Sequence, residues 1–235
     1  MISHADFAAA CEASFWTVLL DLPGFLHCRI AQDSLHGLNL GPAGIYTAGC
    51  LWYMVLNSKS RDVPIAKRLQ LYWERFQVWK KQNKLVGVSI PVFDRSMLGK
   101  AKNVHKSCPE FKIKAHQVRV VAAWLNDELN SELEDEDLCS VLHAPMAVGM
   151  FALASFYFNM DTMPRLLSEE QADEMAQNLE TCLLAHLTPT LTCQLEMGLL
   201  LFDIRPKFHH MAHMVKDIRS ERQNPKFCWC FGDED

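Results

Sequence analysis

The chain has 235 residues, of which 49% are hydrophobic and 10% aromatic, so it is long and apolar enough to bury the core of at least one domain. Its formal charge of −5 disfavours a protein that holds nucleic acid through phosphate neutralisation alone, although a local basic surface is compatible with that charge. Nine cysteines, an odd number in a chain without a charged and then apolar leader pattern, favour reduced thiols in an intracellular protein over a disulfide framework.

The first segment carries one expected helix and one short polar motif. Apolar residues at helical spacing predict a helix over residues 4–20. Asp33 and His36 follow it, three residues apart, and such a pair can orient the imidazole for acid/base or metal chemistry. Pro42 is well placed to begin a second helix that continues to Leu56.

The clearest helical pattern of the chain begins near Asp62, a good N-cap residue, with Pro64 in the first turn. The apolar residues that follow it are spaced three or four apart, and they are Ile65, Leu69, Tyr72, Phe76 and Trp79. Basic residues occupy other positions of the same helix, and the candidate DNA contacts among them are Lys67, Arg68, Arg75, Lys80 and Lys81. We favour a solvated helix face over a phosphate-binding one for these residues.

The middle of the chain is less regular. Residues 86–93 are compatible with one strand, and 100–106 with a basic loop. A helix is expected again over 114–132, where apolar residues recur at helical spacing. The acids of 132–137 are interpreted as a solvated loop rather than a cation site.

An almost entirely apolar run spans residues 141–160 and approaches the length of a membrane span, but Pro145 and Gly149 interrupt it. We therefore expect a buried central helix. After it, the capping pattern from Ser168 to Gln171 predicts the start of a helix that runs to about residue 187.

Pro189 lies in a Thr-Pro-Thr sequence that is expected to end this helix before a short apolar one over 191–201. His209 and His213 should share one face of the next helix. The fold class expected from these elements is mainly α, a multi-helix globular domain with room for a few short strands.

We expect one helical domain over 1–235. Residues 1–41 form its N-terminal helix and Asp-x-x-His segment, 42–201 its helical body, and 202–235 a less ordered tail rich in histidine, cysteine and acids.

The histidines of the tail have the four-residue spacing of zinc-binding helices. His210 stands after His209 where a metalloprotease needs a glutamate, so HExxH chemistry is excluded. Cys228 and Cys230 could complete a zinc site with His209 and His213, but we favour hydrogen-bonding or core histidines. No nucleophile elbow, P-loop or dinucleotide-binding glycine pattern is present, and no small-molecule substrate is indicated.

Taken in order, Asp33-Ser-Leu-His36, a long helical stretch, His209 with His213, and a final aromatic and acidic segment ending in Glu234 resemble the C-terminal half of CACTA (En/Spm-like) DNA transposases and related protist proteins. The resemblance implies that Asp33 and His36 are the signature pair, that His209 and His213 are the paired histidines, and that Glu234 is the last catalytic acid of an RNase H-like core. The strands expected above would then be remnants of that core.

Transposases of this type use acids to hold two Mg²⁺ roughly 4 Å apart. The resemblance places the first two acids before residue 1 and the helix that supports the last acid after residue 235, so no cofactor is expected unless a longer chain completes the site. It implies a transposase-derived fragment that is catalytically inactive alone, with residual DNA binding and a nuclear location. The alternative is an intracellular helical module that binds a protein partner and has no catalytic role.

Overall fold

The computed structural model describes residues 35–60, 62–85, 87–99, 108–135 and 141–228. These residues fold into six α-helices: α2 (Gly44–Asn57), α3 (Ile65–Gln82), α4 (Ala115–Leu133), α5 (His143–Thr162), α6 (Glu169–Leu195) and α7 (Lys207–Glu221). Two short helical segments, η3 (Leu35–Ala43) and η4 (Pro225–Cys228), precede and follow them. The expected mainly helical fold is thereby confirmed, and the described residues contain no strand beyond a single bridge between Leu166 and Gln223.

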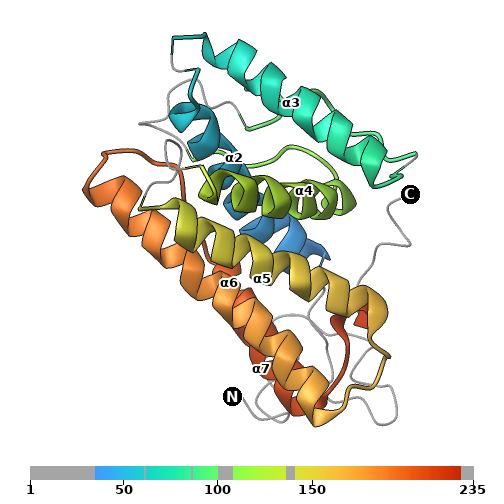
Figure 1. The fold of residues 1–235 in the computed structure, drawn as a ribbon. Helices are drawn as coiled ribbons and strands as arrows, with labels where there is room; N and C mark the ends of the chain where they lie inside the picture. The colour runs from blue at the N-terminus through green and yellow to red at the C-terminus, as the bar shows by residue number, and fades with distance from the viewer. Residues whose placement is uncertain (1–34, 61, 86, 100–107, 136–140, 229–235) are drawn as a thin grey trace, which may run out of the picture.

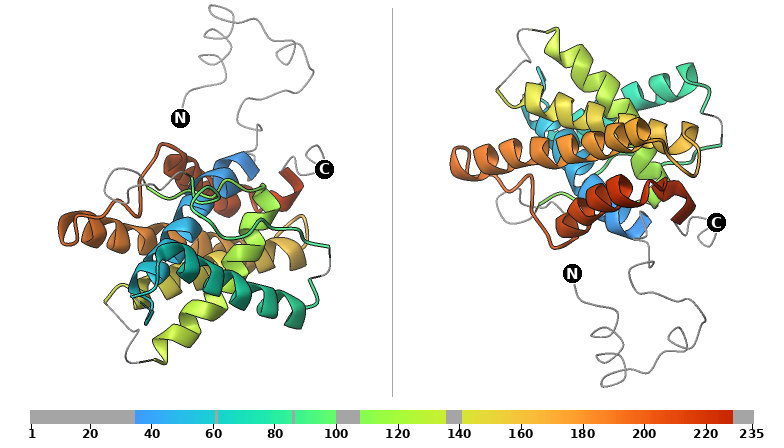
Figure 2. Two further views of the ribbon diagram at one scale, coloured as in Figure 1. Left: turned by 90° about the horizontal axis from the view of Figure 1, so that it is seen from above. Right: turned by 90° about the horizontal axis from the view of Figure 1, so that it is seen from below.

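Helices α4, α5 and α6 lie side by side in one layer, with α3 at the outer edge beyond α4 (Figure 1). Behind this layer run α2, η3 and α7, as the views from above and below show (Figure 2). Helix α2 is the centre of the core because 12 of its residues, from Gly44 to Val55, are buried. A helix that is apolar on every side is stable in water only when other helices surround it, which explains its position.

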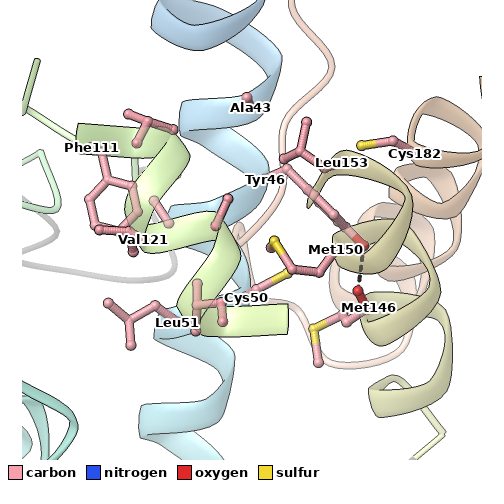
Figure 3. Packing of buried hydrophobic residues seen from close by; sticks show 14 of the residues in the cluster. Ala43, Tyr46, Cys50, Leu51, Phe111, Val121, Met146, Met150, Leu153 and Cys182 are labelled. Carbon is pink, nitrogen blue, oxygen red and sulfur yellow. Dashed lines mark hydrogen bonds between the residues drawn. The ribbon is translucent and has the colours of Figure 1, made fainter. Parts of the chain in front are cut away.

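The core contains a sulfur-rich region where α2 meets α5 and α6 (Figure 3). Tyr46 crosses from α2 to α5 and donates a hydrogen bond of 3.0 Å to the main-chain oxygen of Met146. Cys50 and Cys182 lie in the same buried cluster, and burial raises the pKa of the Cys182 thiol to about 12. All five described cysteines are free thiols, and the buried ones serve packing rather than chemistry.

Aromatic rings fill the space between α3 and α4. Phe76 of α3 lies 5.4 Å from Trp124 of α4, and Phe93 from the irregular segment after α3 packs against both rings at 5.3 and 5.4 Å between centroids. The strand expected over 86–93 does not form in its described residues. No described segment lies beside these residues as a second strand that could hydrogen-bond to their main chain. Phe93 instead contributes its side chain to the helical core.

Two helix boundaries differ from expectation. The N-cap of α3 is Pro64, and Asp62 lies before it without capping the helix. The break expected at Pro189 is absent, since α6 continues through it to Leu195, and the chain then runs without regular structure until α7. Pro189 is buried, so tertiary packing holds the helix together across a residue that removes one backbone donor.

The capping box predicted at the start of α6 is confirmed. The Ser168 hydroxyl accepts a hydrogen bond of 3.2 Å from the main-chain N–H of Gln171, and the Gln171 side chain accepts one of 3.0 Å from the main-chain N–H of Ser168. Salt bridges then tie the acidic first half of α6 to α7, where Arg219 lies 2.8 Å from Glu180 and Arg222 lies 2.7 Å from Glu169.

Candidate functional site

The residues that carry the transposase resemblance are only partly described. Asp33, Glu234 and the side chain of His36 lie outside the described part of the chain, and so does the predicted helix over 4–20. The resemblance therefore stays a prediction.

His209 and His213 do share one exposed face of α7, as predicted. Their Nε2 atoms are 2.7 Å apart, a distance at which one ring donates a hydrogen bond to the other. The ring planes stand edge to face at 89°. These two side chains are therefore hydrogen-bonded surface histidines rather than core residues.

The four-residue zinc site does not assemble. His209 lies in the first turn of α7, whereas Cys228 follows the helix in η4, at the end where Lys226 meets Asp161 of α5. The twelve residue steps from His209 to Glu221, at 1.5 Å each, put about 18 Å between His209 and the C-terminal end of α7. No group of three metal-ligating side chains occurs among the described residues, and Cys230 lies outside them.

Three of the five candidate DNA contacts make hydrogen bonds within the protein. Arg68 donates through Nη1 to the main-chain oxygen of Val55, 2.7 Å away, which satisfies a carbonyl near the end of α2. Arg75 forms a 2.6 Å ion pair with Glu128, and Lys80 donates to the oxygen of Val88 at 2.9 Å. The side chains of the remaining two, Lys67 and Lys81, are exposed. DNA binding by this face stays a prediction.

A buried polar cluster joins α3, α4 and α5. Glu132, only 5% exposed, accepts a hydrogen bond of 2.8 Å from the hydroxyl of Tyr72 on one oxygen and lies 3.2 Å from Nε2 of His143 on the other. Burial, reinforced by the neighbouring carboxylate of Glu132, raises the pKa of Tyr72, so the phenol stays protonated and donates. Arg75, 3.8 Å from Glu132, adds a balancing charge at the rim.

The run of acids over 132–137 predicts a solvated Glu132, and its burial in this cluster corrects that prediction. The signal was present: Glu132 continues the apolar stripe of Leu125 and Leu129 at spacings of four and three residues. A carboxylate on the core side of a helix needs buried hydrogen-bond donors, and the Tyr72 hydroxyl and the His143 ring serve as these donors.

A small cavity of about 130 Å³ opens beside the cluster, bordered by Ser58, Ser60, Arg68, Tyr72 and Glu132 among others. The cations that face it are already engaged, since Lys59 pairs with Asp135 at 2.6 Å and Arg75 pairs with Glu128. The hydroxyl of Ser58 at its border donates a hydrogen bond of 3.3 Å to the main-chain oxygen of Val55. The cluster is therefore best explained as a hydrogen-bonded lock between three helices.

The most unusual surface lies on the outer sides of α5 and α6. Residues 144–160 of α5 and 181–195 of α6 include no aspartate, glutamate, lysine or arginine. Seven large apolar side chains are nevertheless exposed there. Phe158 borders a hollow lined by residues of α3 and α4, and we call the other six the neutral face: Val148, Phe151, Leu184, Leu187, Leu191 and Leu195. Exposure reaches 58% at Phe151 and 80% at Leu195.

The two helices present these residues together because they pack tightly side by side. A Cβ on Gly149 of α5 would lie 2.8 Å from the Cβ of Ala185 in α6, so the helices touch at that level. Val148 and Phe151 flank Gly149 on the outer side, and Leu184 and Leu187 flank Ala185. The neutral face is thus continuous across both helices.

No described helix is long and apolar enough to span a membrane. Comparisons of the chain with protein-family models, with curated proteins and with solved structures gave no match.

Proposed function

We propose that this protein is a helical interaction module that binds a protein partner through the neutral face of α5 and α6. One observation carries the proposal: two adjacent helices expose large apolar side chains over stretches of 144–160 and 181–195 that contain no charged residue. We further propose that the module acts inside the cell, where its free thiols stay reduced.

An outer helix face normally carries charged and polar residues because water must solvate it. Helix α7 illustrates the normal case, with Lys216, Arg219 and Glu221 exposed. Contiguous apolar surface with few charges is instead characteristic of the centre of protein interfaces, where leucine and aromatic side chains lose water on binding. The neutral face has that composition.

The charges around the neutral face favour a protein over a lipid surface as its partner. Membrane-binding helices flank their apolar side with lysine and arginine, which attract anionic lipids. Here the neutral stretch of α6 lies between Glu180 and Glu196. Acids at both ends would repel an anionic membrane.

The proposal is tested by placing a charge on the neutral face. The purified chain is immobilised and exposed to an extract of the cells that express it, in parallel with Phe151→Glu, Leu191→Glu and a control, Val78→Glu. Val78 is 58% exposed, as Phe151 is, but lies on α3. We expect a specific protein, a second copy of this chain included, to be retained by the unmodified chain and the control and lost from both neutral-face variants.

Retention of the same proteins by all four forms would show that the neutral face is not the binding surface. Circular dichroism and thermal unfolding serve as the folding control. Both substituted residues are already more than half exposed, so stability should change by less than about 0.5 kcal/mol.

A further inference from the structure

We infer that the partner of the neutral face is a second copy of this chain, bound by antiparallel packing of the two α6 helices. The inference rests on the proposed function and specifies its partner. Its centre is a row of four leucines in the second half of α6: Leu184, Leu187, Leu191 and Leu195.

These leucines lie on one side of the helix. Their spacings of three, four and four residues keep them within a narrow stripe, which is the spacing that packs one helix against another. Their exposed fractions are 60, 38, 53 and 80%. The opposite side of the same segment is buried through Cys182, His186, Pro189 and Cys193.

Among the described residues, no element covers the leucine row. Ala185 is level with Gly149, so Leu191 is level with about the first residue of α5 and Leu195 lies beyond it. Figure 2 shows this end of α6 projecting past the body of the protein. A second helix can therefore approach the leucine row without displacing any element that the structure describes.

The row is self-complementary when two copies run in opposite directions. An axis of two-fold symmetry level with Pro189 places Leu184 opposite Leu195 of the second copy, and Leu187 opposite Leu191 of the second copy. Each contact then occurs twice, which is the pattern of a closed symmetric dimer. Because this end of α6 projects from the protein, the antiparallel register places the two protein bodies toward opposite ends of the helix pair.

Charge distinguishes this arrangement from a parallel one. Toward the N-terminus the same stripe of α6 continues through Glu180 and Asp173, whose side chains are 46 and 66% exposed. In a parallel pair, each of these acids would lie beside the equivalent acid of the second copy, and the two like charges would repel each other. The antiparallel pair keeps them apart, and Arg219, 2.8 Å from Glu180 and 3.6 Å from Asp173, stays available to each within its own chain.

Sedimentation velocity of the full chain over a range of concentrations tests the inference. We expect a dimer of twice the 26.8 kDa chain mass with a dissociation constant on the order of micromolar, as for a small interface. Leu184→Glu and Leu195→Lys should each weaken it at least about tenfold, equivalent to about 1.4 kcal/mol. Val78→Glu should leave it unchanged.

The double variant Leu184→Glu with Leu195→Lys separates the two directions of packing. In the antiparallel dimer the new glutamate faces the new lysine of the second copy, so dimerisation should recover relative to either single variant. In a parallel dimer each new charge faces the same charge on the second copy, so dimerisation should weaken further. Such weakening would overturn the inference. Circular dichroism confirms that each variant is folded.

The outcomes also separate this inference from the proposed function. A chain that stays monomeric at 100 times the expected dissociation constant, yet retains another protein through the neutral face, overturns self-association and leaves the interaction module standing. A chain that stays monomeric and retains no other protein through the neutral face would contradict both the self-association and the proposed interaction module. A dimer unaffected by all substitutions in the leucine row also overturns the inference.

Discussion

Tyr46 occupies the space that any side chain at Gly149 would need. A Cβ at Gly149 would lie 2.1 Å from the hydroxyl oxygen of Tyr46 and 2.8 Å from the Cβ of Ala185. Helices α2, α5 and α6 therefore meet at a point where only glycine fits. This contact brings α5 and α6 close enough for their outer sides to form one continuous surface, the neutral face.

Gly149→Ala should destabilise the protein, although alanine is the better helix former by about 1 kcal/mol. The added methyl group must displace either the Tyr46 ring or helix α6, and overpacking of this kind costs about 1–3 kcal/mol or more. The free energy of unfolding from urea denaturation measures the effect. An unchanged or higher stability would show that the three helices are not in close contact here.

A double variant provides the matched control. Tyr46→Phe removes the atom nearest to the new methyl group but also the 3.0 Å hydrogen bond to Met146. Gly149→Ala should therefore cost less free energy in the Tyr46→Phe background than in the unmodified chain, because the two residues are in direct contact. Additive effects would contradict the arrangement.

His186 should make stability depend on pH in the acid range. Burial lowers its pKa from 6.5 to about 4, while Nε2 lies 3.0 Å from the main-chain oxygen of Asp203 and the ring stacks on Phe208 at 4.5 Å. Between these two pKa values the unfolded chain binds a proton that the folded chain does not. The stabilising contribution of neutral His186 is therefore complete above about pH 6.5. As the pH drops to about 4, this residue lowers the free energy of unfolding by about 3 kcal/mol.

His186→Phe tests this dependence because it keeps an aromatic ring between Tyr46 and Phe202, the other two rings around this position. We expect its free energy of unfolding to fall less steeply than that of the unmodified chain between pH 6.5 and 4.5. The comparison cancels the carboxylates, which titrate in both proteins. Parallel curves would show that His186 is not buried in its neutral form.

The polar lock around Glu132 should contribute strongly to stability. Glu132→Ala leaves the Tyr72 hydroxyl and the His143 ring nitrogen without their carboxylate and should lower the free energy of unfolding by about 3 kcal/mol. Tyr72→Phe removes one of the two donors and should cost about 1–2 kcal/mol. The exposed Glu134→Ala is the control, with a change below about 0.5 kcal/mol. Equal effects of the two glutamate variants would contradict a buried lock.

Periodicity alone predicted much of the helical fold. The helices α2, α3 and α4 appear within a few residues of their expected positions because their apolar residues repeat at helical spacing. Helix α5 was expected from its almost entirely apolar run rather than from a periodic pattern. Pro189 misled the prediction, since a local breaker was outweighed by burial of its ring in the core. The strand predicted over residues 86–93 from their β-branched side chains does not form in the described structure, because no other strand is there to pair with it.

The candidate site was harder to predict, since exposure depends on which helices become neighbours. The leucines of α6 had been assigned to two helices, so their common stripe across Pro189 was not apparent. The pairing of His209 with His213 was predictable because it depends on one helix alone. The role of Arg68 was not, because the carbonyl of Val55 that it binds belongs to another helix.

Asn224 should anchor the C-terminal end of the described chain to α5. Its side-chain amide donates to the main-chain oxygens of Met160 and Met163 at 3.0 and 3.1 Å, and its side-chain oxygen accepts from the N–H of Lys226 at 3.0 Å. Asn224→Asp keeps the shape but cannot donate to the two carbonyls, so the free energy of unfolding should fall by about 2 kcal/mol. Gln223→Glu, at a partly exposed position, should have a much smaller effect on the same measurement.

Site-specific photo-crosslinking tests the central claim, that the neutral face binds protein, most directly. A photoreactive phenylalanine analogue is placed at position 151 or 191 on the neutral face, or at position 78 on α3 as the control of matched exposure. We predict a discrete crosslinked product, to a second copy or to another protein, from positions 151 and 191 and none from position 78. Products of equal yield from all three positions, or from position 78 alone, would contradict the claim.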